Sequence, residues 1–343
     1  MISRSIAWTE VVRFIFRALM MLLVLAAVLA GAGWWWLNQP LPLSQPTLEL
    51  EVEPGTTPRG VAREVVKAGA DRCAAAVCLV PRLGQDRQIK AGNYELTTGL
   101  TPYVLLQKLA RGEESLKALT LVEGWNWRQV RAALAREEFL RQESAGMDDA
   151  ALMQALGRPG VAPEGRFFPD TYTYAKGSSD LAVLRRALHA MDRRLADVWA
   201  LRSADTPLKS PDEALTLASI VEKETGRAAD RAQIAGVFTN RLRIGMLLQT
   251  DPTVIYGLGE KFDGNLRRRD LQTDTPWNTY TRAGLPPTPI AMPGKAALMA
   301  AVQPSQTKAL YFVARGDGTS HFSASLDEHN RAVNRYQRGQ QKP

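Results

Sequence analysis

The sequence predicts an α+β protein in three parts: one N-terminal transmembrane helix, a small α+β module and a larger mixed α+β domain. Three observations predict this class. Residues 18–37 are an uncharged and mainly apolar run near the N-terminus. Residues 48–53 alternate apolar and acidic side chains, as a half-buried strand does. Further along, 210–226 has the signals of a capped helix, and 310–325 has those of a hairpin. A chain of 343 residues is long enough for two or three domains.

The composition limits the class of partner. Lys and Arg number 43 against 35 Asp and Glu, a net charge of +8, which suits nucleic acid, anionic lipid or an anionic polymer. The arginines are scattered and no nucleic-acid-binding motif accompanies them, so we expect no nucleic acid. Two cysteines and three dispersed histidines form no metal-ligand pattern, so we expect no metal and no cofactor. Cys73 and Cys78 are poorly spaced for a disulfide without a local break in the chain.

The apolar run at 18–37 predicts a membrane anchor. At a rise of 1.5 Å per residue it spans about 30 Å, the thickness of one bilayer core. Arginines precede it, so the tail at 1–17 is expected to be cytoplasmic, and Trp34–Trp36 lie where an interfacial aromatic belt would. A cleaved signal peptide is the alternative, because residues 30–32 resemble a cleavage site. The length of the run and the tryptophans favour a retained anchor, with everything after Pro40 outside the cytoplasmic membrane.

A proline-rich linker is predicted at 38–46. The small α+β module follows at 47–117. Its pattern predicts a strand, a helix, a second strand and a second helix, in the order 48–52, 61–66, 89–96 and 101–112. Thr101 is the expected N-terminal cap of the last helix, and Gly112 is its expected end.

The large domain, 118–343, begins with a predicted strand, a turn and a helix whose Trp127, Val130 and Leu134 share one face. The segment PEGRFFPDTYTY at 163–174 is dense in aromatic residues. Aromatic faces beside carboxylates suit sugar rings, although such a cluster is more often core. A long helix is predicted over 179–201.

The next helix, 210–226, carries clear boundary signals. Ser210 is a suitable N-terminal cap, Pro211 suits the first helical position, and Glu213 completes a capping box. Gly226 is the expected stop. Between them Leu217, Ile220 and Val221 form one apolar stripe, and the next position of that stripe holds Glu224 instead of an apolar residue.

This spacing separates two carboxylates. Glu224 lies within roughly 20° of Leu217 around the helix, whereas Glu222 lies about 140° away. We therefore expect Glu222 to face water or the helix flank and Glu224 to face the interior. A carboxyl that is buried at a helix C-terminus has a raised pKa, as a general acid requires. The alternative interpretation is a partly buried glutamate paired with an arginine.

After a further helix through 234–242, two polar segments are candidate binding loops. The first is LLQTDPTVIYGLG at 247–259, with Gln249 and Asp251 beside a proline. The second, 276–294, is a long stretch with five prolines that carries Asn278 and Tyr280. Irregular segments of this length inside a domain are usually functional. The last part of the chain has a predicted hairpin, 310–325, and a polar helix, 326–337.

Four long motifs resemble the MltG (YceG-like) family of membrane-anchored endolytic murein transglycosylases. They are ASIVEKET, NRLRIGMLLQTDPTVIYG, NTYTRAGLPPTPIAMPG and YFVARGDGTSHF, which begin at residues 218, 240, 278 and 311. The resemblance implies that 118–343 is a YceG-like lytic transglycosylase domain. The strand and helix order of 47–117 resembles a LysM-like domain, which either binds glycan or serves as a spacer.

The family resemblance implies the chemistry. Glu224 matches the family's catalytic glutamate, and the reaction is cleavage of the β-1,4 bond between N-acetylmuramic acid and N-acetylglucosamine. The C6 hydroxyl of the muramic acid closes onto C1, which leaves a 1,6-anhydro end, so one glutamate can act first as acid and then as base. By the same motifs Gln249, Asp251, Asn278 and Tyr280 are expected to bind substrate. Glu222 is the fallback acid, and Glu164 either faces the groove or braces its turn.

Location and partners follow in the same way. We expect a single-pass protein of the bacterial inner membrane, with a cytoplasmic N-terminus and a periplasmic catalytic domain. Its substrate would be nascent peptidoglycan strands near the membrane, which it would release or terminate during elongation. Cell-wall synthases of elongation or division are expected partners. Two other functions stay open: a non-catalytic glycan-binding anchor, and a muramidase-type hydrolase that uses Glu224 with Asp251 as a carboxylate pair.

Overall fold

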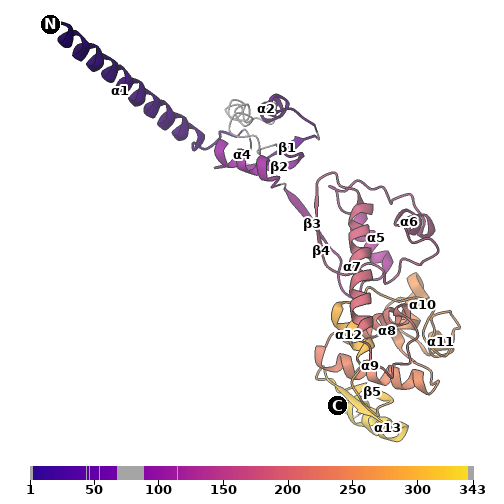
Figure 1. Ribbon diagram of the computed structural model, residues 1–343. Helices are drawn as coiled ribbons and strands as arrows, with labels where there is room; N and C mark the ends of the chain where they lie inside the picture. Colours follow the sequence, from indigo (N-terminus) through magenta and orange to yellow (C-terminus); the bar gives the residue numbers. More distant parts are fainter. Residues whose placement is uncertain are drawn as a thin grey trace. The chain divides into compact units, whose positions relative to one another are not determined.

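The computed structural model describes residues 3–43, 45, 47–53, 55–67, 89–113 and 115–338 (Figure 1). Cys73 and Cys78 lie outside these ranges. The chain divides into two compact units, Met1–Leu116 and Lys117–Pro343. Both contain helices and strands, so the predicted mixed α+β class is confirmed.

The first unit begins with a single long helix, α1 (Ser3–Leu37). Its stretch Phe16–Leu37 is long and apolar enough to cross a membrane, and no residue of its most apolar 18-residue window is buried by the protein. Exposed apolar side chains along such a stretch favour an apolar surrounding medium, which is consistent with a membrane anchor.

The rest of the first unit is built on two antiparallel strands, β1 (Thr47–Val52) and β2 (Gly92–Thr97), paired with Leu50 opposite Tyr94. Helix α2 (Pro58–Lys67) packs on β1, and α4 (Pro102–Arg111) packs on β2. Their apolar faces form a common core.

Helix α4 has the predicted boundaries. The Thr101 hydroxyl accepts a hydrogen bond from the Val104 N–H, and Gly112 closes the helix with φ 72°, a conformation that favours glycine. The predicted strands and helices of this module are therefore confirmed within the described residues.

The second unit opens with β3 (Leu116–Thr120), which pairs with β4 (Thr171–Ala175). Helices α5 (Trp127–Ala135), α6 (Asp149–Ala155) and α7 (Asp180–Ala200) pack around this pair. The aromatic residues of 163–174 are mostly buried, and Phe167 stacks on Trp127 at 4.9 Å between ring centroids. This aromatic cluster is therefore core.

The remaining elements of the second unit begin with the helix that carries Glu224. They are α8 (Pro211–Glu224), α9 (Ala228–Arg243), α10 (Asp251–Leu258), a 3-10 turn (Gly259–Lys261), α11 (Arg268–Gln272), α12 (Lys295–Val302), β5 (Tyr311–Ala314), β6 (Ser320–Ser323), α13 (Leu326–Val333) and a π-helical turn (Asn334–Arg338). Strands β5 and β6 form the predicted antiparallel hairpin. The proline-rich segment 276–294 has no regular secondary structure, as predicted.

Helix α8 is the centre of this unit, with α7, α9, α10 and α12 packed around it (Figure 1). All eight residues from Ala214 to Val221 are buried, so the helix is covered on every side and not along one stripe only. Each fully buried Leu, Ile or Val stabilises the fold by about 1.5–3 kcal/mol. This packing holds the C-terminal end of α8 in place.

The ends of α8 differ in how closely they follow the prediction. Ser210 accepts from the Glu213 N–H at 3.2 Å, as expected of an N-terminal cap. The Glu213 carboxylate, however, accepts from the Lys209 N–H at 2.6 Å, so the reciprocal half of the capping box reaches one residue further back. The helix ends at Glu224, followed by an extended Thr225, and Gly226 does not adopt a left-handed cap. The helix therefore ends where predicted, with Gly226 directly after the C-terminal cap residue Thr225, although Gly226 does not supply the left-handed conformation.

Candidate active site

Glu224 is the last residue of α8 and lies partly buried against the start of α10. The Thr250 hydroxyl donates a hydrogen bond to its carboxyl group. Thr250 occupies the N-terminal cap position of α10, yet its hydroxyl makes no cap. The hydroxyl that would ordinarily cap the N-terminus of α10 therefore bonds to Glu224 instead.

The surroundings of Glu224 favour its protonated form. Burial raises the pKa of the Glu224 carboxyl above its ordinary 4.5, and the hydrogen bond from Thr250 opposes that rise. The negative charge of Asp251 raises the pKa further, whereas the positive charge of Arg241 lowers it. The net effect is a carboxyl that holds its proton to a higher pH than a free glutamate does.

Buried threonines connect the two loops beside Glu224. The Thr250 N–H donates to the Thr279 hydroxyl oxygen at 3.1 Å, and the hydroxyls of Thr253 and Thr279 are 2.8 Å apart. All three residues are at most 2 % exposed. The loop that carries Thr250 and the loop that carries Thr279 therefore form one hydrogen-bonded structure.

The predicted binding residues Asp251 and Tyr280 lie together on this structure. The Tyr280 hydroxyl donates to the Asp251 carboxylate at 2.5 Å. Burial and this hydrogen bond raise the pKa of Tyr280, and the negative charges of Asp251 and Glu224 raise it further. Gln249 precedes them with an exposed side chain and a left-handed backbone, φ 47°, which costs of order 1 kcal/mol for a non-glycine residue. The structure thus brings Gln249, Asp251 and Tyr280 beside Glu224.

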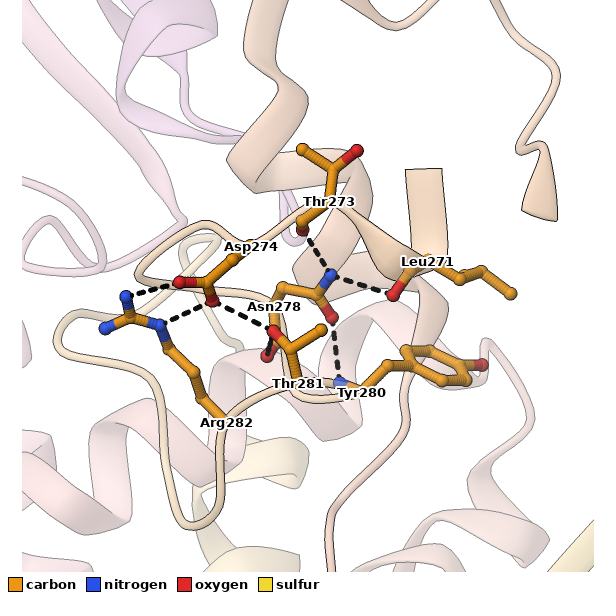
Figure 2. Close-up of polar contacts among 7 residues, drawn as sticks. All are labelled: Leu271, Thr273, Asp274, Asn278, Tyr280, Thr281 and Arg282. Atoms are coloured by element: carbon orange, nitrogen blue, oxygen red, sulfur yellow. Dashed lines mark hydrogen bonds and ion pairs between the residues drawn. The ribbon is translucent and has the colours of Figure 1, made fainter. Parts of the chain in front are cut away.

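Asn278 lies differently from the other predicted binding residues. It is fully buried, and Figure 2 shows its amide nitrogen directed at the backbone oxygens of Leu271 and Thr273, at 3.0 and 2.6 Å. Its amide oxygen accepts from the Tyr280 N–H at 2.8 Å. All these contacts of the Asn278 side chain are with its own loop. Asn278 therefore acts on a ligand only indirectly, by fixing the position of Tyr280.

The same loop is held from its outer side by an exposed ion pair. The Arg282 guanidinium contacts both oxygens of Asp274 at 2.8 Å, and the Thr281 hydroxyl donates to Asp274 at 3.0 Å (Figure 2). Asn278 inside and Asp274 outside together shape the turn from which Tyr280 projects.

Arg241 is a site residue that the sequence analysis did not single out. It projects from α9, is 7 % exposed, and donates to the backbone oxygens of Leu310 and Leu248 at 2.7 and 2.8 Å. These bonds hold the segment before Gln249 and supply the positive charge near Glu224. The sequence did contain a signal for this residue. Ile234, Val237 and Arg241 lie on one helical stripe, and Arg241 stands where an apolar residue is expected, just as Glu224 does on its own helix.

Glu222 lies on the flank of α8, one of the two positions expected of it, and it does not face water. Its side chain is 8 % exposed, accepts from the Gly294 N–H at 2.9 Å, and lies 4.0 Å from the guanidinium of Arg231. The end of the proline-rich loop covers this flank of α8, which helical spacing alone does not reveal. Burial raises the pKa of Glu222, opposed by the Gly294 hydrogen bond.

Glu164 lines a cavity of about 820 Å³ next to the Glu224 site. It is 5 % exposed, and both its oxygens accept from the Trp127 N–H, at 3.1 and 3.0 Å. Burial raises its pKa to about 7. Gly165 allows this placement, because its φ is 76° and a Cβ there would lie 2.5 Å from Pro289.

Glu224 is not among the residues that line this cavity, although its neighbour Lys223 is, as is Pro252 beside Asp251. The cavity and the Glu224 site therefore adjoin along the end of α8 and the start of α10. Within the part of the chain that the structure describes, no group of three His, Cys, Asp or Glu side chains is arranged to hold a metal ion.

A partly buried carboxyl with a raised pKa, beside exposed hydrogen-bonding groups and a cavity, is the arrangement of an enzyme that uses general acid catalysis. Comparison with known proteins gives the family. The model of the YceG-like family matches residues 50–335, and the chain belongs to this family. The resemblance drawn from the four motifs is confirmed.

Relatives and a solved structure agree with this assignment. An endolytic murein transglycosylase of Bacillus subtilis is 34 % identical over 264 residues, which cover 72 % of this chain and 73 % of the relative. One of Streptococcus pneumoniae is 29 % identical over 282 residues, 71 % of this chain and half the length of that relative. The crystal structure of a YceG-like protein from Listeria monocytogenes is 29 % identical, with a TM-score of 0.54, and the match covers 84 % of this chain and 99 % of that one.

Proposed function

We propose that this protein is a peptidoglycan lytic transglycosylase, a lyase that cleaves the β-1,4 bond between N-acetylmuramic acid and N-acetylglucosamine within glycan strands. The observation that carries the proposal is the Glu224 carboxyl, kept protonated by burial and by Asp251 and held by the Thr250 hydroxyl. Membership of the YceG-like family and the names of the relatives support the same chemistry.

Glu224 acts in two steps. In the first it donates its proton to the glycosidic oxygen, the C1–O4 bond breaks, and the N-acetylglucosamine side leaves with a free 4-hydroxyl. Positive charge develops at C1 of the muramic acid. In the second, the Glu224 carboxylate accepts the proton of the C6 hydroxyl while O6 bonds to C1. The product has a 1,6-anhydro end, no water is consumed, and Glu224 is protonated again.

The neighbouring groups support both steps. Arg241 stabilises the Glu224 carboxylate between the two proton transfers, because a positive charge nearby favours the ionised form. Asp251 and Tyr280 are substrate-binding groups, since their charged and polar atoms lie close to Glu224. Gln249 is the third, because its exposed side chain directly precedes Thr250, which contacts Glu224. Asn278 is a positioning residue, because its amide is used to hold the turn before Tyr280.

The proposed setting is the inner membrane. The apolar helix Phe16–Leu37 would anchor the protein with a cytoplasmic N-terminus, which places the catalytic domain, 118–343, in the periplasm near nascent strands. The module at 47–117 is proposed as a LysM-like domain, supported by its paired strands β1 and β2 and its two helices. Cutting strands there would release or terminate them during elongation, next to the synthases that make them.

A muramidase-type hydrolase is the second candidate, and one observation favours it. Asp251 presents an exposed carboxylate close to Glu224, as a base or nucleophile would. Mass spectrometry of murein digested by the full chain separates the candidates. We expect 1,6-anhydro ends. Reducing ends would support the hydrolase, and no new ends would support a non-catalytic glycan-binding anchor.

A further inference from the structure

The cavity beside the Glu224 site has the lining of a sugar-binding site. Four aromatic residues line it: Phe262 after the 3-10 turn, and three from other segments, Trp127 at the start of α5, Tyr256 on α10 and Trp277 in the proline-rich loop. Aromatic faces pack against the C–H faces of sugar rings. Its volume of about 820 Å³ is within the range of small-molecule sites, roughly 300–1,000 Å³.

The last three of these aromatic side chains are held in place by other contacts. The Trp127 indole N–H donates to Asp149 at 2.8 Å, and its ring stacks on Phe167. The Trp277 indole N–H donates to the Thr288 hydroxyl at 2.9 Å, and Tyr256 meets Trp277 edge to face with centroids 5.4 Å apart. A wall that is rigid before binding loses little conformational entropy when a ligand arrives.

Glu164 is the buried polar group of this wall. Its carboxyl contacts the Trp127 N–H and the Tyr256 hydroxyl, which leaves further hydrogen-bonding capacity on a group that lines the cavity. Its neutral form both donates and accepts. A sugar hydroxyl or an N-acetyl group needs partners of this kind.

The charged groups of the cavity lie at its rim. Arg128 and Glu260 form an ion pair at 3.1 Å with side chains that are 55 % and 83 % exposed. The Lys223 ammonium donates to the Gly124 backbone oxygen at 3.2 Å. Apart from Glu164 and the neutral Asn126, the rest of the lining is aromatic, aliphatic or glycine, which suits a neutral amphipathic ligand better than the charged stem peptide of murein.

We propose that this cavity is a second saccharide site, which binds an N-acetylated hexosamine of the glycan strand at a distance from the bond that is cut. The sugar packs against Trp127, Tyr256 and Trp277 and hydrogen-bonds to Glu164. The strand runs from this site to Glu224, because Lys223 and Pro252 line the cavity and directly adjoin Glu224 and Asp251. The inference rests on the proposed function, since it takes the same polymer as ligand.

The test compares glycan fragments of increasing length. The full chain in detergent carries Glu224→Gln, so that fragments bind without being cut, and affinity is measured by calorimetry for peptide-free murein disaccharides, tetrasaccharides and octasaccharides. We expect the longest fragments to bind at least about tenfold more tightly than the shortest, about 1.4 kcal/mol. Ile255→Trp fills the cavity from α10 and is expected to remove that gain while leaving disaccharide affinity within about twofold.

A further variant guards against a merely structural effect. Ile244→Trp adds the same side chain at an exposed position outside the cavity lining and is expected to keep the full gain with length.

Retention of the full gain by Ile255→Trp would overturn the second saccharide site. A gain seen only with peptide-bearing fragments would also overturn it, since the occupant would then be the stem peptide. Failure of the proposed function has a different signature: the unsubstituted chain would release no anhydro ends from murein, whatever the fragments show.

Discussion

Two glutamates of the second unit, Glu224 and Glu164, share a raised pKa but lie in surroundings of different kinds. Glu224 lies near the hydroxyl of Thr250, the carboxylate of Asp251 and the guanidinium of Arg241. Glu164 lies among aromatic rings, with the Trp127 N–H and the Tyr256 hydroxyl as its partners. Burial is the largest cause of the raised pKa in both cases.

The difference shows why one carboxyl suits proton transfer and the other suits binding. Once Glu224 gives up its proton, Thr250 and Arg241 stabilise the carboxylate, so the group can take the proton back in a second step. Of the two, only Glu224 has a positive side chain among the causes of its shift. Burial disfavours the ionised form of Glu164 by more than the hydrogen bonds from Trp127 and Tyr256 favour it. The neutral form of this group therefore suits binding.

The largest expected effect is on the rate. Glu224→Gln removes the proton donor and is expected to lower the release of anhydro ends by roughly 10²–10⁴-fold, the usual contribution of a general acid. Glu164→Gln is expected to cost less than about tenfold on full-length strands. Glu222→Gln, two residues away on the same helix, is the matched control and is expected to retain activity. If Glu222→Gln were the inactive variant, the acid would be Glu222.

The second prediction concerns stability and tests the Glu164 half of the comparison. Because folding raises the pKa of Glu164 to about 7, its protonated carboxyl stabilises the fold fully below about pH 4.5. This stabilisation is lost as the pH rises through about 7. Glu164→Gln does not titrate, so its free energy of unfolding relative to the unsubstituted chain is expected to rise by about 3 kcal/mol between these pH values. Urea unfolding of the full chain in detergent at pH 4.5 and 8 measures this. An equal difference at both pH values would show that Glu164 has an ordinary pKa.

The third prediction tests the charge beside Glu224. Asp251 raises the pKa of Glu224, so Asp251→Asn is expected to lower it. The acid is active when protonated, and the alkaline limb of the pH–rate profile therefore moves to lower pH. If the alkaline limb did not move, Asp251 would not be a cause of the raised pKa of Glu224. Complete loss of activity at every pH would favour the hydrolase, in which Asp251 takes part in the chemistry.

Local patterns predicted much of this fold. The stripe of Leu217, Ile220 and Val221 pointed to Glu224, because helical geometry alone determines which residues share a face. The caps at Ser210 and Thr101 follow from hydrogen bonds between residues three apart. The hairpin β5–β6 follows from strand patterns on either side of a glycine-rich turn.

The features that escaped prediction depend on contacts between distant segments. Glu222 is covered by a loop some seventy residues further along the chain, which no helical pattern can reveal. Asn278 has a polar side chain of the kind that binds ligands, but its amide nitrogen donates to backbone oxygens of its own loop. The cavity at Glu164 combines residues from 124 to 290, so it exists only once the second unit has folded.

The most direct test of the central claim is a titration of the Glu224 carboxyl itself. Infrared difference spectra of the full chain and its Glu224→Gln variant, recorded across pH, isolate the carboxyl band of this one residue. We predict a protonated carboxyl that persists above pH 4.5 and that disappears at lower pH in Asp251→Asn than in the unsubstituted chain. A midpoint at or below 4.5 would contradict the claim that the surroundings of Glu224 raise its pKa and so favour the protonated acid.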